Sequence, residues 1–122
     1  MADMLADKLA GYGIDYADAM ERMDGNADLY KKLALKYLHN DCMANLAAAM
    51  EMKDFDMAYK AAHTLKGASG NLSFMALYDI VAAESAALYQ GEYEAAEKML
   101  PDVQAAHDKV VAGLVAWEDG AF

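Results

Sequence analysis

One stretch of predicted helix carries the residue types that could do chemistry: a histidine, a lysine and two glycines between positions 63 and 70. Apolar and small residues recur there at helical spacing and define a buried stripe: Ala58, Ala61, Ala62, Leu65, Ser69 and Leu72. At about 100° per residue, His63 lies about 150° from the centre of that stripe and should face water. A neutral imidazole is a good nucleophile near pH 7, so His63 is a candidate acceptor for a transferred group.

The residues around His63 suit a site that another molecule must approach. Gly67 lies one turn after His63 on the same exposed side, and Gly70 follows about one turn later. A glycine inside a helix destabilises it by about 1 kcal/mol relative to alanine, which this chain uses freely elsewhere. We favour clearance for a partner over close helix packing as the reason for both glycines. Lys66 is three residues from His63 and would neutralise an anion held there.

Two residues lie one turn before His63, namely Tyr59 and Lys60. Either they border a docking surface around the histidine, or they are a half-buried tyrosine and a solvated lysine without such a role.

Composition limits the class of protein. The 122 residues suit one domain with one core, and 57% are hydrophobic, which is too many for a disordered chain. The formal charge of −10 argues against nucleic acids and anionic membranes as partners. Cys42 is the only cysteine, so no intramolecular disulfide can form, as is usual in a reducing compartment. No segment is apolar enough to span a membrane, and no signal peptide is evident, so we expect a cytoplasmic protein.

The apolar pattern predicts two short N-terminal helices followed by four substantial ones. Their expected ranges are about 3–10, 16–23, 26 or 28 to 52, 54 to 71 or 72, 75–89, and 92 or 93 to 118. Pro101 falls inside the last range, where we expect a kinked helix. Four helices joined by short turns give an all-α fold, an antiparallel up-down-up-down four-helix bundle with short N-terminal helices. We expect a single domain over residues 1–122 with its core at about 13–118.

The pattern around the histidine resembles the signature of histidine-containing phosphotransfer (HPt) domains. It consists of His63-x-Leu65-Lys66-Gly67, a small residue at Ser69 and then Gly70. The similarity extends roughly from Gly13 to Leu114 and implies the same four-helix architecture. It also implies that His63 accepts a phosphoryl group from an aspartate of a response-regulator receiver domain and passes it to another receiver, with Lys66 screening the new charge.

The resemblance implies further properties. Such a domain is a phosphoryl carrier without its own ATP site rather than an enzyme, and it needs no cofactor, because Mg²⁺ belongs to the receiver. Its partners would be receiver domains and a sensor or hybrid histidine kinase, and an open His63 face favours a monomer. In some HPt domains a polar residue at about the place of Ser85 hydrogen-bonds the histidine region. Many members have Leu-Glu where this chain has Glu84-Ser85, and a glycine where it has Ser73.

Other functions remain open. The phosphoacceptor domain of a chemotaxis-type histidine kinase shares the His-x-x-Lys-Gly motif, and a docking bundle that is never phosphorylated is a third reading. A helical-bundle metalloenzyme is disfavoured, because the residues three positions before the histidines are Lys36, Lys60 and Gln104 rather than glutamate. His-x-x-x-His and Cys-x-x-Cys are also absent, so we expect no metal site.

Overall fold

The computed structural model describes residues 2–122, with side chains from Met4 onward, and all regular elements in this range are helical. In chain order they are α1 (Ala2–Ala10), α2 (Tyr16–Arg22), α3 (Ala27–Lys36), the 3₁₀ turn η1 (Tyr37–His39), α4 (Cys42–Glu51), α5 (Phe55–Asn71), α6 (Met75–Tyr89) and α7 (Tyr93–Glu118). The protein is an all-helical bundle, as its sequence predicts.

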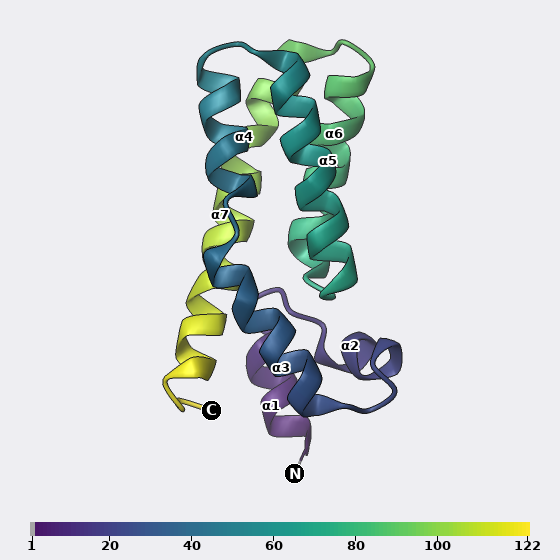
Figure 1. Ribbon diagram of the computed structural model, residues 1–122, viewed down its shortest axis with the longest axis vertical. Helices are drawn as coiled ribbons and strands as arrows, with labels where there is room; N and C mark the ends of the chain where they lie inside the picture. The colour runs from purple at the N-terminus through teal and green to yellow at the C-terminus, as the bar shows by residue number, and fades with distance from the viewer. Residues whose placement is uncertain (1) are drawn as a thin grey trace.

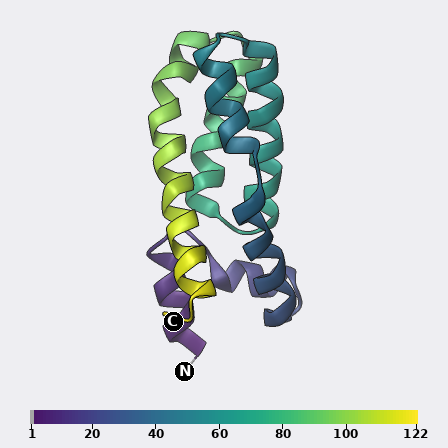
Figure 2. The same ribbon diagram turned by 60° about the vertical axis from the view of Figure 1, so that its left-hand side comes forward.

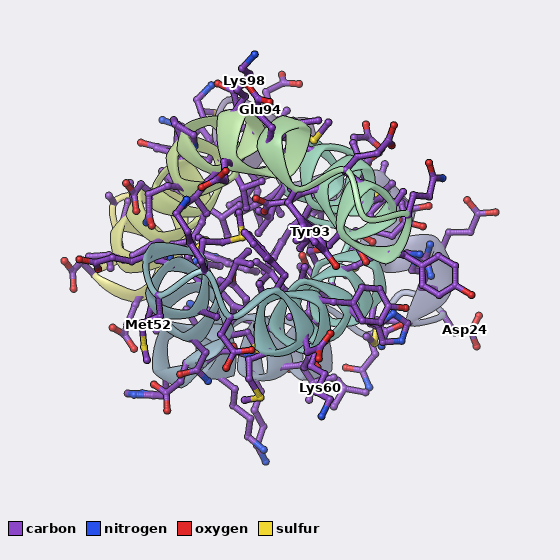
Figure 3. All side chains as sticks on the ribbon, turned by 90° about the horizontal axis from the view of Figure 1, so that it is seen from above. Asp24, Met52, Lys60, Tyr93, Glu94 and Lys98 are labelled. Atoms are coloured by element: carbon purple, nitrogen blue, oxygen red, sulfur yellow. The ribbon has the colours of Figure 1, made fainter. Side chains whose placement is uncertain are left out.

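The molecule is elongated, and its helices form two groups, one at each end. At one end α4, α5, α6 and the first part of α7 lie side by side, and α1, α2 and α3 lie at the other end, where α3 packs against the last part of α7 (Figures 1 and 2). The 26-residue helix α7 therefore runs through both ends, and it continues as one helix through Pro101. Seen along the long axis, side chains fill the interior, and the labelled Lys60, Glu94 and Lys98 lie at the periphery (Figure 3).

Three helices begin where the sequence places a capping side chain. The carboxylate of Asp15 accepts a hydrogen bond from the amide of Asp18 (3.0 Å) at the start of α2. The side chain of Asn26 caps α3 in the same way, and that of Asp54 caps α5. These side chains satisfy amide groups that have no partner inside the helix, which fixes where each helix starts.

The prediction of one long helix from residue 26 or 28 to Met52 is wrong. The chain tightens into η1, and Asn40 then adopts an extended backbone with ψ of 130°. The side chain of Asn40 accepts a hydrogen bond from the amide of Cys42 (2.8 Å), an alternative to the helical pattern. Tyr37 holds this turn in the core, because its hydroxyl bonds His107 Nδ1 (2.7 Å) and its ring packs edge-on against Phe74.

The core combines aliphatic side chains of the bundle with an aromatic cluster at its N-terminal end. Leu46, Leu65, Val81 and Val103 are fully buried, one from each of the helices α4 to α7. The aromatic cluster joins Tyr16, Tyr30 and Trp117, whose ring centroids lie 6.0 to 6.2 Å apart. Among residues 2–122, no helix is long and apolar enough to cross a membrane.

Candidate functional site

Helix α5 presents His63 to solvent, as its sequence predicts. Ala58, Ala62, Leu65 and Ser69 are buried, while His63 is exposed on the opposite side. The packing of α5 against α4 and α6 fixes this orientation. The imidazole is therefore open to a reacting partner without any movement of the backbone.

Two aromatic residues lie on one side of His63. The ring of Tyr59 stacks on that of His63 with centroids 5.8 Å apart, and Tyr89 of α6 lies 5.7 Å from Tyr59. Together with Ala82, Ala86, Gln90, Lys66 and Ser85 they line a shallow hollow of about 250 Å³ between α5 and α6. The sequence prediction included Tyr59 near the histidine but not Tyr89, which comes from the next helix.

Lys66 separates this hollow from a second one. The second hollow, of about 340 Å³, is lined by Lys66 together with Arg22, Gly67, Gly70, Asn71, Met75 and Tyr78. Lys66 is half-buried and lines both hollows. We call them the His63 hollow and the Arg22 hollow.

The two glycines that the sequence paired have different surroundings. A Cβ atom built on Gly67 would have no neighbour within 4 Å, so the helix surface is open there. A Cβ atom on Gly70 would lie 3.0 Å from the ring of Tyr78, which covers that position. The open surface at Gly67 suits the close approach of a partner, whereas at Gly70 the packing of Tyr78 accounts for the missing side chain.

Two other predicted site residues, Ser85 and Lys60, and the motif residue Ser69 have different surroundings. Ser85 is buried at the His63 hollow, but within the described chain no hydrogen bond joins it to His63. Lys60 is exposed and lines a separate groove between α4 and α5 that includes Cys42. Ser69, on the inner side of α5, donates to the carbonyl of Leu65 (2.8 Å) and is satisfied within its own helix.

The carboxyl group next to Ser85 is unusual. Glu84 is fully buried, and neither carboxylate oxygen has a hydrogen-bond partner. Burial raises the pKa of Glu84 to about 7, because a charge is poorly solvated in the core. No cluster of three or more His, Cys, Asp or Glu side chains that could hold a metal ion occurs in the described part of the chain.

A comparison with known protein families finds one family whose model matches this chain. The Hpt domain model matches residues 38–113, which include all of α4, α5 and α6. The chain belongs to the Hpt domain family. Hpt domains perform histidine phosphotransfer in phosphorelays, with two-component partners such as receiver domains and kinases. Comparisons with curated proteins and with solved structures give no match.

The family match does not extend to the N-terminal helices. Arg22 of α2 lies outside residues 38–113, yet it lines a hollow together with Lys66 and Gly67. Spacing along the chain could not reveal this arrangement, because these residues line one hollow only in the folded protein. The single signal in the sequence is that Arg22 is its only arginine.

Proposed function

We propose that this Hpt domain relays a phosphoryl group through His63, accepting it from the aspartyl phosphate of one receiver domain and passing it to the aspartate of another. The observation that carries the proposal is the exposed imidazole on a packed helix, with open helix surface one turn away at Gly67. A receiver is a whole folded domain, so its phosphorylated side chain can reach His63 only where neighbouring side chains leave room.

The transfer needs no group beyond those of the two proteins and the receiver's Mg²⁺. The unprotonated ring nitrogen of His63 supplies an electron pair and forms an N–P bond, while the O–P bond of the aspartyl phosphate breaks. The aspartate leaves as a carboxylate, and the other ring nitrogen keeps its proton. In-line attack requires the imidazole to be oriented, which the stacked ring of Tyr59 supports.

Lys66 is proposed to stabilise the phosphoryl charge without trapping it. It lines the His63 hollow and carries a compact positive charge on a flexible side chain. A shallow, solvated hollow screens that attraction, so the phosphoryl group remains transferable to the next receiver. Tyr59, Gly67 and Ser85 complete the proposed surface, as do Lys60 and Gly70 at its margins.

The proposal includes the architecture that supports the relay. We infer that α4 to α7 form an antiparallel up-down-up-down four-helix bundle and that residues 1–122 are one domain with its core at about 13–118. Short connections between successive helices and the extensive packing of α5 on α4 and α6, and of α6 on α7, support this reading. We further propose a cytoplasmic monomer that binds no cofactor itself.

Phosphotransfer in vitro tests the proposal. A panel of receiver domains is phosphorylated with acetyl phosphate and Mg²⁺, the protein is added, and acid-labile phosphate on it is measured. His63→Gln is compared with His39→Gln, which removes another exposed histidine. Label that is lost only in His63→Gln supports the relay, and label that persists in His63→Gln refutes the assignment of His63.

Absence of label from every receiver would contradict the receiver-to-histidine relay. The next step would then be ATP with a chemotaxis-type kinase domain. Label from that source would identify a kinase phosphoacceptor, and continued absence would leave the docking bundle as the alternative.

A further inference from the structure

The Arg22 hollow brings the only arginine of the chain to the face that carries His63. Arg22 is the last residue of α2, and the hollow also contains Lys66 and Gly67 of α5. Lys66 is shared with the His63 hollow, so the two hollows are adjacent. A partner that covers Gly67 to reach His63 would therefore also lie over Arg22.

The guanidinium of Arg22 is held in a defined position. Its Nε donates to Asp18 Oδ2 (2.8 Å), and the same oxygen accepts a hydrogen bond from Ser73 Oγ (2.7 Å). Ser73 is fully buried in the turn between α5 and α6, and its carbonyl accepts from the amide of Asp15 (2.8 Å). These bonds tie α2 to the end of α5, so Arg22 is positioned before any partner binds.

The terminal nitrogens of the guanidinium remain available. The bond to Asp18 uses Nε, and no other hydrogen bond or ion pair to Arg22 is formed within the described residues. An arginine fork of this kind binds a carboxylate through two parallel hydrogen bonds, which a lysine cannot reproduce.

The charge of the hollow is opposite to that of the chain. Its lining contains Arg22 and Lys66 but no carboxylate. Two carboxylates adjoin it, because Asp18 is paired with Arg22 and Glu21 lies near enough to act on the charge of Arg22. The chain as a whole carries −10. The negative remainder of the protein repels an acidic group, whereas the hollow attracts it. An acidic partner is therefore directed to this place.

We propose that the Arg22 hollow binds an acidic side chain of the receiver domain that exchanges phosphate with His63, and that Arg22 helps to select among receivers. The inference rests on the proposed function. The shared wall at Lys66 and the open surface at Gly67 favour a protein carboxylate over free phosphate, because a docked domain would cover both hollows at once.

Arg22→Gln tests the inference, with Lys109→Gln as its control. Both variants remove one positive charge, and Lys109 is an exposed residue of α7 outside both hollows. We expect kcat/KM for transfer from a cognate receiver to fall about 5- to 20-fold in Arg22→Gln relative to the control, because charged rim contacts act mainly on encounter and docking. The transfer rate at saturating receiver should change less than about twofold, and Arg22→Lys should recover part of the loss.

A small-molecule donor separates docking from phosphate binding. Direct labelling of His63 by phosphoramidate should be equal in Arg22→Gln and Lys109→Gln. Equal loss with phosphoramidate and with the receiver would overturn the inference, because the hollow would then serve the phosphoryl group itself. Thermal unfolding of each variant shows whether the compared proteins are folded. If Arg22→Gln does not fold, Arg22→Lys takes its place in the comparison.

The two proposals fail in different ways. If no receiver labels the wild type, the proposed relay fails and the inference fails with it. If the wild type is labelled and Arg22→Gln matches Lys109→Gln in kcat/KM, only the docking role of Arg22 is overturned.

Discussion

The ring of His63 lies against the ring of Tyr59, with centroids 5.8 Å apart and an angle of 29° between the planes. Both residues are on α5 and are separated by one helical turn, which places their side chains on the same face. Tyr59 in turn contacts Tyr89 on α6. One side of the imidazole is therefore supported by a ring that is itself supported by the neighbouring helix.

Removing this support should slow the labelling of His63. Aromatic pairs of this kind contribute about 0.5 to 1.5 kcal/mol, so Tyr59→Ala should reduce the rate about 2- to 10-fold by releasing other rotamers of the histidine. Tyr59→Phe should retain the wild-type rate, because the ring and not the hydroxyl makes the contact. Single-turnover labelling with phosphoramidate measures this without any docking step, and equal rates for Tyr59→Ala and wild type would contradict the orienting role.

The exposure of His63 could be predicted because it depends only on helical periodicity and on small apolar residues around it. The helix starts could be predicted because Asp15, Asn26 and Asp54 are capping residues that act within one turn. Both features depend on residues that are close together in the sequence.

The break at Asn40 could not be predicted, because apolar residues continue at helical spacing on both sides of it. The turn depends on the distant contacts of Tyr37 with His107 and Phe74. The position of Arg22 beside Lys66 depends in the same way on packing between distant segments. Contacts of this kind leave no periodic signal along the chain.

Lys66→Ala should shift the equilibrium of phosphotransfer away from His63. The lysine lines the His63 hollow, and a partly solvated charge pair is worth about 1 kcal/mol or less, so the equilibrium constant should fall about two- to fivefold. The measurement is the distribution of label between a receiver and this protein at equilibrium. Lys98→Ala on α7, whose side chain lies at the periphery in Figure 3, is the matched control and should leave the distribution unchanged.

Gly67→Ala should stabilise the fold and impair docking. Its Cβ atom meets nothing within 4 Å, so the helix gains up to about 1 kcal/mol and the melting temperature should rise by a few degrees. Transfer from a receiver should slow, while labelling by phosphoramidate should not. A rise in stability with unchanged transfer from receivers would show that the open surface at Gly67 is not used by the partner.

Gly70→Ala should give less stabilisation than Gly67→Ala, or none. The new Cβ atom would lie 3.0 Å from two atoms of the Tyr78 ring, so the ring must move and the helical gain is offset. A double-mutant cycle with Tyr78→Ala isolates this contact, and the effect of Gly70→Ala should become more favourable when the ring is absent. Additive effects in the cycle would mean that the ring does not limit Gly70.

Glu84 should make the stability of the protein depend on pH between about 4.5 and 7. Its pKa is about 7 in the folded protein against an ordinary value of 4.5, because its buried carboxylate has no hydrogen-bond partner. In this range the folded state keeps a proton that the unfolded state has released. The free energy of unfolding therefore falls as pH rises, by about 3 kcal/mol in total, and levels off above pH 7.

Glu84→Gln removes this dependence, since glutamine has nearly the same shape and does not ionise. Urea unfolding should give similar stabilities for variant and wild type at pH 5 and a more stable variant at pH 8. The difference between the two proteins is the relevant quantity, because burial lowers the pKa of His107 and adds a slope of opposite sign to both. Glu94→Gln, at the exposed start of α7, should show no such difference. An equal gap between Glu84→Gln and wild type at pH 5 and pH 8 would mean that Glu84 titrates normally, and the carboxylate would then have to reach water through motion of α6.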